Sequence, residues 1–149
     1  MYDFFNSKKK KVFLKDVENS FGCSFDKDNI FFINNKGKVY MLSKDFSFLK
    51  TELFRLDAMG LYIGRYNQGI YKPSIEGSQL LGPKATKNVI ELTREQRNEW
   101  LLGHDVPVSA EENIYILKYE DDYLGSGKVK EGYVLINIPK ARRLKVVND

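Results

Sequence analysis

Short apolar runs separated by turn-forming residues are the feature that most restricts how this chain can fold. Ile30–Ile33 and Val39–Leu42 flank the polar segment Asn34–Gly37, a pattern typical of a β-hairpin with a tight turn. The strongest interruption is Gly82 with Pro83, because glycine and proline together break both helices and strands. The pattern predicts small sheets and short helices, with a boundary between two domains after Pro83.

Residues 1–83 predict a small α/β domain. Apolar residues at helical spacing indicate a helix that reaches Phe21 and ends at Gly22, and a second helix that begins at Ser43 and ends before Gly60. The remaining elements follow in order: a strand at Leu61–Ile63, a turn at Asn67–Gly69, a strand at Ile70 and Tyr71, and a short helix that begins after Ser74 and reaches Leu81.

Residues 84–149 predict a small β-barrel with one early helix. Thr93 and Gln96 have the spacing of a capping box, so a helix is expected from there to Leu102, with Gly103 as its C-terminal stop. Strands are expected at residues 88–92, 113–119, 133–138 and 143–147, and Gly125–Lys128 is expected as a turn between the second and third.

The composition is that of a globular chain and excludes several classes of protein. Of the 149 residues, 42% are hydrophobic and 30% are charged, which does not match a disordered or fibrous chain. Cys23 is the only cysteine, so neither an intramolecular disulfide nor a cysteine zinc site is available. No run approaches the roughly 18 apolar residues that cross a membrane, and no signal-peptide segment is visible. We therefore expect a soluble cytoplasmic protein that does not associate with membranes.

The formal net charge of +4 is modest, but its distribution along the chain is uneven. From Glu91 to Asp122 there are nine acidic and three basic residues, whereas from Tyr123 to Asp149 there are six basic and two acidic residues. A local concentration of positive charge favours binding to a polyanion such as RNA, because each neutralised phosphate releases condensed counterions.

Three segments of the C-terminal half carry a resemblance to a known module. They are Trp100–Val106 at the end of the expected helix, the glycine-rich Leu124–Lys128, and the basic Asn137–Arg143. Together, over roughly residues 87–147, they resemble the PUA domain, the RNA-binding module of pseudouridine synthases and archaeosine transglycosylases. The last segment is similar to the end of the PUA domain attached to archaeal-type RNA cytosine-C5 methyltransferases.

The upstream segments Gly60–Gly64 and Lys72–Ser74 look like the pre-PUA domain that precedes this module in those methyltransferases and in small ribosome-assembly proteins. The resemblance implies an α+β fold, in which a small α/β domain precedes a pseudobarrel with one or two short helices. It also implies binding of structured tRNA or rRNA, while another domain or partner performs the chemistry. These 149 residues contain no methyltransferase cofactor loop or catalytic cysteines, so we expect no catalytic residue, cofactor or metal.

The first candidate RNA contact is the expected glycine-rich turn, because glycines let a backbone approach phosphates and lysines supply charge. It consists of Gly125, Ser126, Gly127, Lys128 and, nearby, Lys130. The alternative is an ordinary hairpin whose glycines serve positive φ angles and whose lysines are solvated. The turn is not a phosphate-binding P-loop, since Asp122 and Val129 replace required residues.

The second candidate is the basic C-terminal segment. Lys140, Arg142, Arg143 and Lys145 alternate in part with apolar residues such as Leu144, so the cations can project from one face of a strand while the apolar side chains enter the barrel. The alternative is an edge strand whose charges prevent aggregation. Asn137 either hydrogen-bonds RNA or closes a turn.

The third candidate lies in the first domain, where Arg65 and Lys72 accompany Tyr62, Tyr66 and Tyr71. Basic and aromatic residues together can pair phosphate contacts with stacking on unpaired bases. Strand alternation nevertheless predicts that some of these tyrosines are buried.

Other residues with reactive or charged side chains have simpler expected roles. His104 is expected as a loop or capping residue, Cys23 as an inert thiol, and Asp121 with Asp122 as part of a turn. The run Lys8–Lys11 is either a polybasic arm or a solvated helix start.

The leading hypothesis is thus a non-catalytic RNA-binding protein that acts in RNA modification or ribosome assembly. The alternatives are an adaptor subunit that docks onto an RNA-modifying enzyme and, least supported, a small hydrolase that uses Asp121, Asp122 or His104.

Overall fold

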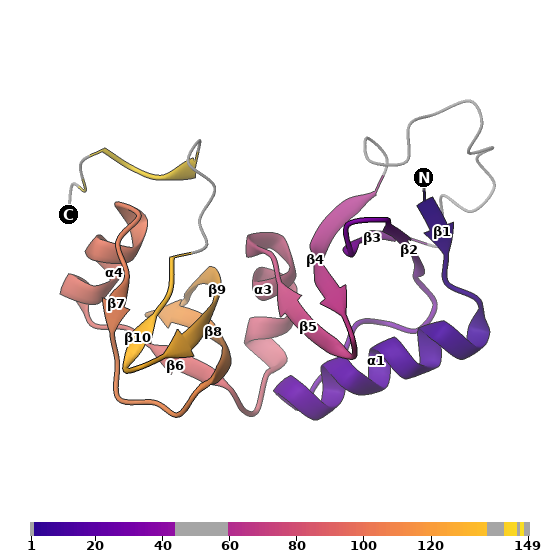
Figure 1. Cartoon of the computed structure of the whole chain (residues 1–149), viewed down its shortest axis with the longest axis horizontal. Coiled ribbons are helices and arrows are strands. Elements are labelled where there is room, and N and C mark those ends of the chain that lie inside the picture. Colours follow the sequence, from indigo (N-terminus) through magenta and orange to yellow (C-terminus); the bar gives the residue numbers. More distant parts are fainter. Residues whose placement is uncertain (1, 44–59, 137–141, 146, 148–149) are drawn as a thin grey trace.

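The computed structural model describes residues 2–43, 60–136, 142–145 and 147, in which two five-stranded sheets lie on either side of the short helix α3 (Ile75–Leu81) (Figure 1). The fold is mixed α+β, as expected. The predicted boundary at Pro83 falls in the 3₁₀ turn η3 (Gly82–Lys84), which connects the two sheets along the chain. That boundary stays a prediction, and the helix expected from Ser43 to Gly60 lies almost entirely outside the described residues.

The first sheet has the strand order β1–β2–β3–β4–β5, and every neighbouring pair is antiparallel. Its strands are β1 (Tyr2–Phe4), β2 (Ile30–Asn34), β3 (Lys38–Leu42), β4 (Leu61–Asn67) and β5 (Ile70–Pro73). The predicted β2–β3 hairpin is confirmed, and Gly37 has the positive φ of 81° that its turn requires. Strand β1 was not predicted, because three residues at a sheet edge carry too little pattern.

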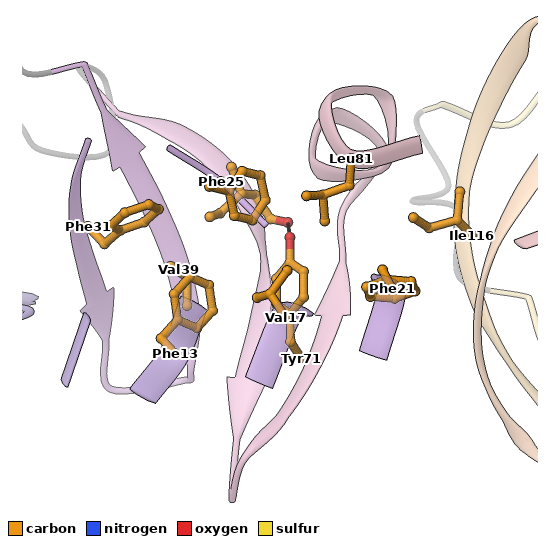
Figure 2. Packing of buried hydrophobic residues seen from close by; sticks show 10 residues of the cluster. Phe13, Val17, Phe21, Phe25, Phe31, Val39, Tyr71, Leu81 and Ile116 are labelled. Carbon is orange, nitrogen blue, oxygen red and sulfur yellow. Dashed lines mark hydrogen bonds between the residues drawn. The ribbon is translucent and has the colours of Figure 1, made fainter. Parts of the chain in front are cut away.

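Helix α1 (Ser7–Phe21) covers one face of this sheet (Figure 1). Asn6 caps it by accepting a hydrogen bond from the Lys9 backbone N–H at 2.8 Å, and Gly22 ends it with φ 76°, as predicted. Its buried side chains pack against residues of the sheet and of the loop before β2 (Figure 2): Phe13, Val17 and Phe21 against Phe25, Phe31, Val39 and Tyr71. Each buried phenylalanine stabilises the fold by about 1.5–3 kcal/mol.

Helix α3 begins where the sequence predicts, because the Ser74 hydroxyl accepts a hydrogen bond from the Gly77 backbone N–H at 3.0 Å. Gly77 lies so close to the Ile63 carbonyl and the Tyr71 hydroxyl that no larger residue fits there. Helix α3 is therefore seated tightly on β4 and β5.

The second sheet has the order β6–β8–β9–β10–β7. Its strands are β6 (Val89–Glu91), β7 (Val106–Pro107), β8 (Asn113–Tyr119), β9 (Asp122–Lys130) and β10 (Tyr133–Val134), and only the β6–β8 pair is parallel. Helix α4 (Arg94–Leu101) begins with the predicted capping box of Thr93 and Gln96. Trp100 anchors α4 to a small core that contains Leu117, Val129 and Val134.

The predicted turn at Gly125–Lys128 is wrong, because these residues lie inside the long strand β9. The actual turns are at Glu120–Asp121 and at Glu131–Gly132, where Glu131 and Gly132 have φ angles of 53° and 83°. Gly127 is needed for packing instead, since a Cβ atom there would collide with Val134 and crowd the Trp100 ring. Gly125, with φ 125°, follows a shift in the β8–β9 register.

Two expected C-terminal strands are also corrected. The strand expected at residues 133–138 ends at Val134 as β10. The described residues 142–145 form no strand, because the Leu144 backbone N–H donates to the Leu101 carbonyl at 2.8 Å and holds this segment against the end of α4. Leu144 is 44% exposed and does not enter a barrel.

The larger of the two hydrophobic clusters extends from the first sheet to the second. Ile116 of β8 belongs to the same buried cluster as Phe21 of α1 and Leu81 of α3 (Figure 2). Polar contacts reinforce this junction: the Asn88 side-chain amide donates to the Ser20 carbonyl, and the buried Ser126 hydroxyl donates to the Pro73 carbonyl. Strands β5 and β9 are therefore held in a fixed relation.

Candidate nucleic-acid interface

Three basic residues lie in one row across the first sheet. Lys38 of β3 is the cross-strand partner of Arg65 in β4, and Arg65 is the partner of Lys72 in β5. We call these three residues the basic row. Like charges directly opposite one another destabilise a sheet, so this arrangement carries a cost that a bound anion would offset.

The basic row lies on the face of the sheet that α1 does not cover. Val39 and Tyr71 pack in the core beneath α1, so their neighbours Lys38 and Lys72 point to the opposite face. The register shift next to Val39 and the positive φ of Gly64 bring Arg65 to this face as well.

The basic row forms one side of a groove of about 510 Å³ between the two halves of the molecule. Helix α3 contributes its N-terminal residues, and the other side comes from β9, α4 and the C-terminal segment. The lining residues are Lys38, Tyr62, Arg65, Lys72, Pro73, Ser74, Ile75, Glu76, Trp100, Leu124, Gly125, Ser126 and Arg142. The groove is thus built from several segments that are far apart in the sequence.

The ionisation of Lys72 is affected by its position in this groove. Burial lowers the pKa of Lys72, and the positive charges of Arg65 and Lys128 lower it further. All three effects disfavour the protonated form of the Lys72 amine. A phosphate placed between Lys72 and Arg65 would reverse that effect.

Tyr62 and Trp100 are the aromatic residues among those that line the groove, and of these two Trp100 is buried. The Lys38 amine lies 5.5 Å from the centroid of the Tyr62 ring, and the Tyr40 ring lies 5.6 Å away on the same face. The prediction that some tyrosines are buried is confirmed: Tyr71 is 2% exposed, and the Tyr66 hydroxyl donates to Asp16 of α1.

The other predicted RNA contacts differ in their exposure and in whether the structure describes them. Ser126 lines the groove, but it is buried and its hydroxyl is engaged by Pro73. Lys128 and Lys130 are exposed on β9, and Lys128 is near enough to Lys72 to affect its pKa. Asn137 and Lys140 lie outside the described residues.

The C-terminal arginines are already engaged within the protein. Arg142 lines the groove and forms an ion pair with Glu76 of α3 at 2.7 Å. The Arg143 side chain packs over Gly103, whose missing Cβ gives it room. Lys145 is exposed beyond this contact.

Sequence reasoning missed Lys38 as a groove residue. The available signal was its place directly after the hairpin turn, on the strand that pairs with β4. The pairing of Lys38 with Arg65 depends on the β3–β4 register, which no local pattern specifies.

The residues given simpler roles occupy ordinary surroundings. His104 lies 2.6 Å from Glu99 with both side chains exposed, and burial raises the pKa of the Cys23 thiol. Asp121 is in a turn, as predicted, whereas Asp122 is the first residue of β9. Within the described ranges, no cluster of three His, Cys, Asp or Glu residues could hold a metal ion. Among those same residues, no helix is long and apolar enough to cross a membrane.

Comparison with known families identifies the C-terminal half. Residues 87–144 match the family model described as "Methyltransferase RsmF PUA domain", and no curated protein matches the chain. Residues 87–144 thus form a PUA domain like that of RNA cytosine-C5 methyltransferases, as the resemblance implied. The groove joins this domain to the upstream sheet that carries the basic row.

Proposed function

We propose that this chain, through its PUA domain and the adjoining basic row, binds structured tRNA or rRNA in the cytoplasm without catalysing a reaction itself. It would act in RNA modification or ribosome assembly, in which a separate domain or partner performs the chemistry. The observation that carries the proposal is the basic row of Lys38, Arg65 and Lys72 facing the PUA domain across one groove.

The electrostatics of the groove support a polyanionic ligand. The basic row and Lys128 concentrate four positive charges, and two of these cations, Arg65 and Lys128, lower the pKa of Lys72 by repulsion. Neutralising phosphates releases condensed counterions, and the release favours binding most strongly where cations are clustered.

The matching experiment measures fluorescence anisotropy with a tRNA, an rRNA fragment and duplex DNA of similar length at several salt concentrations. The test variant carries Lys38→Gln, Arg65→Gln and Lys72→Gln. We expect the wild type to prefer one folded RNA at physiological salt. The variant should lose about tenfold or more in affinity and show a salt slope that is shallower by about 2.

A matched control removes the same number of charges elsewhere. Lys11, Lys15 and Lys27 are exposed and belong to α1 and the loop after it, so the control carries Lys11→Gln, Lys15→Gln and Lys27→Gln. The control should retain the affinity and the RNA preference. Equal losses in both triple variants, or equal weak binding to all three nucleic acids, would contradict the proposal and direct attention to protein partners.

A further inference from the structure

The groove fits a smaller part of an RNA than the backbone of a duplex. Neighbouring strands lie about 4.8 Å apart, so the three strand positions of the basic row fall within about 10 Å. Cations at this spacing converge on one or two phosphates rather than following a duplex. The groove volume of about 510 Å³ is also within the range of pockets that hold a single small ligand.

Tyr62 offers an aromatic surface beside these cations. Behind it, Tyr40 lies 5.6 Å from the Tyr62 ring and stacks on the buried Phe32 at 5.2 Å with an interplanar angle of 8°. These contacts restrict the motion of Tyr62, so stacking on its ring costs little further side-chain entropy. The Lys38 amine lies over the same ring, 5.5 Å from its centroid, so a base that stacks there takes the place of this amine and leaves it free to contact the phosphate.

We infer that the groove receives one unpaired nucleotide of the bound RNA, with its base against Tyr62 and its phosphate on the basic row. This inference rests on the proposed RNA binding and specifies which part of the RNA enters this site. A paired base cannot reach the Tyr62 ring, because its faces are covered by its neighbours in the duplex, whereas a bulged or terminal base can stack on it.

The test compares two RNA hairpins that differ only in one bulged nucleotide, which carries the fluorescent base 2-aminopurine. The wild-type chain should bind the bulged hairpin on the order of tenfold more tightly than the paired one, and the fluorescence of the bulged base should fall on stacking. Tyr62→Leu, which keeps apolar contact with Tyr40 but lacks a ring, should abolish the preference and the fluorescence change. Tyr62→Phe should keep both.

Tyr133→Leu is the matched control, because Tyr133 is 48% exposed on β10 and does not line the groove. The melting temperature of each variant establishes that it is folded. Equal wild-type affinity for both hairpins, or a preference that survives Tyr62→Leu, would overturn the inference. In that case a loss of binding in the variant that lacks the basic row would leave the proposed function standing, whereas failure to bind either hairpin would count against both.

Discussion

Lys72 shows how a single residue links the fold to the proposed binding. Its backbone belongs to β5, where Tyr71 is fixed in the core, so its side chain must enter the groove next to Arg65. Burial and two nearby cations lower its pKa, and the free protein therefore releases this proton at a lower pH than an exposed lysine does. A bound phosphate would raise the pKa again.

This linkage predicts that RNA binding takes up a proton. At alkaline pH, below the ordinary lysine pKa, part of the free Lys72 is neutral and becomes charged in the complex, so affinity should fall as pH rises. Calorimetry at pH 9 in buffers with different ionisation enthalpies measures the number of protons taken up. Lys72→Arg should remove the uptake while it keeps the charge. Proton release, or an uptake unchanged in Lys72→Arg, would exclude Lys72 as the responsible group.

At the scale of elements, β9 makes contacts in both halves of the molecule. It pairs with β8 and β10 in its own sheet, and its Ser126 contacts Pro73 of β5. The strand is closely packed at Gly127, where the side chains of Trp100 in α4 and Val134 in β10 approach its backbone. Space at Gly127 therefore determines how closely α4 and β10 can pack against β9.

Replacing Gly127 with alanine is expected to destabilise the protein by about 1–3 kcal/mol, because the added methyl group overfills this contact. Urea denaturation followed by circular dichroism measures the change in the free energy of unfolding. The control is Gly132→Asn, since Gly132 has φ 83° and open space around it, and asparagine tolerates that conformation. Similar stability in wild type and Gly127→Ala would show that the strand can shift to make room.

Local signals explain which elements the sequence predicted. The capping residues Ser74 and Thr93 act on their own helices, so the starts of α3 and α4 could be located from neighbouring residues. Helix α1 was located from its apolar spacing and from Gly22 at its end, whereas its cap Asn6 was not recognised. Gly125 and Gly127 misled the prediction because they serve contacts with distant residues, and a glycine-rich tripeptide also has the composition of a turn.

The candidate site was predictable only in part, for the same reason. Arg65 and Lys72 were identified because they are basic residues close to several tyrosines in the sequence. The structure places both in the groove. Lys38 was missed because strand register brings it next to Arg65. The arginines at 142 and 143 were identified as a strand face, but their contacts with Glu76 and Gly103 are tertiary and leave no trace in the local pattern.

At the scale of the whole molecule, the hydrophobic cluster that extends between the two sheets predicts cooperative unfolding. Ile116 is fully buried in the cluster that contains Phe21 and Leu81, so truncation of its side chain should weaken both halves together. We expect Ile116→Ala to lower the free energy of unfolding by about 2–5 kcal/mol.

Two probes can check this cooperativity in one experiment. Trp100 is the only tryptophan and reports on the second sheet, while circular dichroism also reports on α1. Within each protein the two signals should share one midpoint, and the midpoint of Ile116→Ala should lie at a lower denaturant concentration than that of the wild type. Separate midpoints would show that the halves unfold independently. Leu144→Ala is the control, because Leu144 is 44% exposed.

The position of the groove between the two sheets limits what protein engineering can transplant. A cassette of residues 87–144 would carry Trp100 and Ser126, but it would leave behind the basic row, Tyr62 and the carbonyl acceptor of Ser126 at Pro73. It would also expose Ile116 to solvent at the cut surface. A fusion designer who wants this recognition surface therefore has to move the upstream sheet, α3 and the PUA domain as one indivisible part.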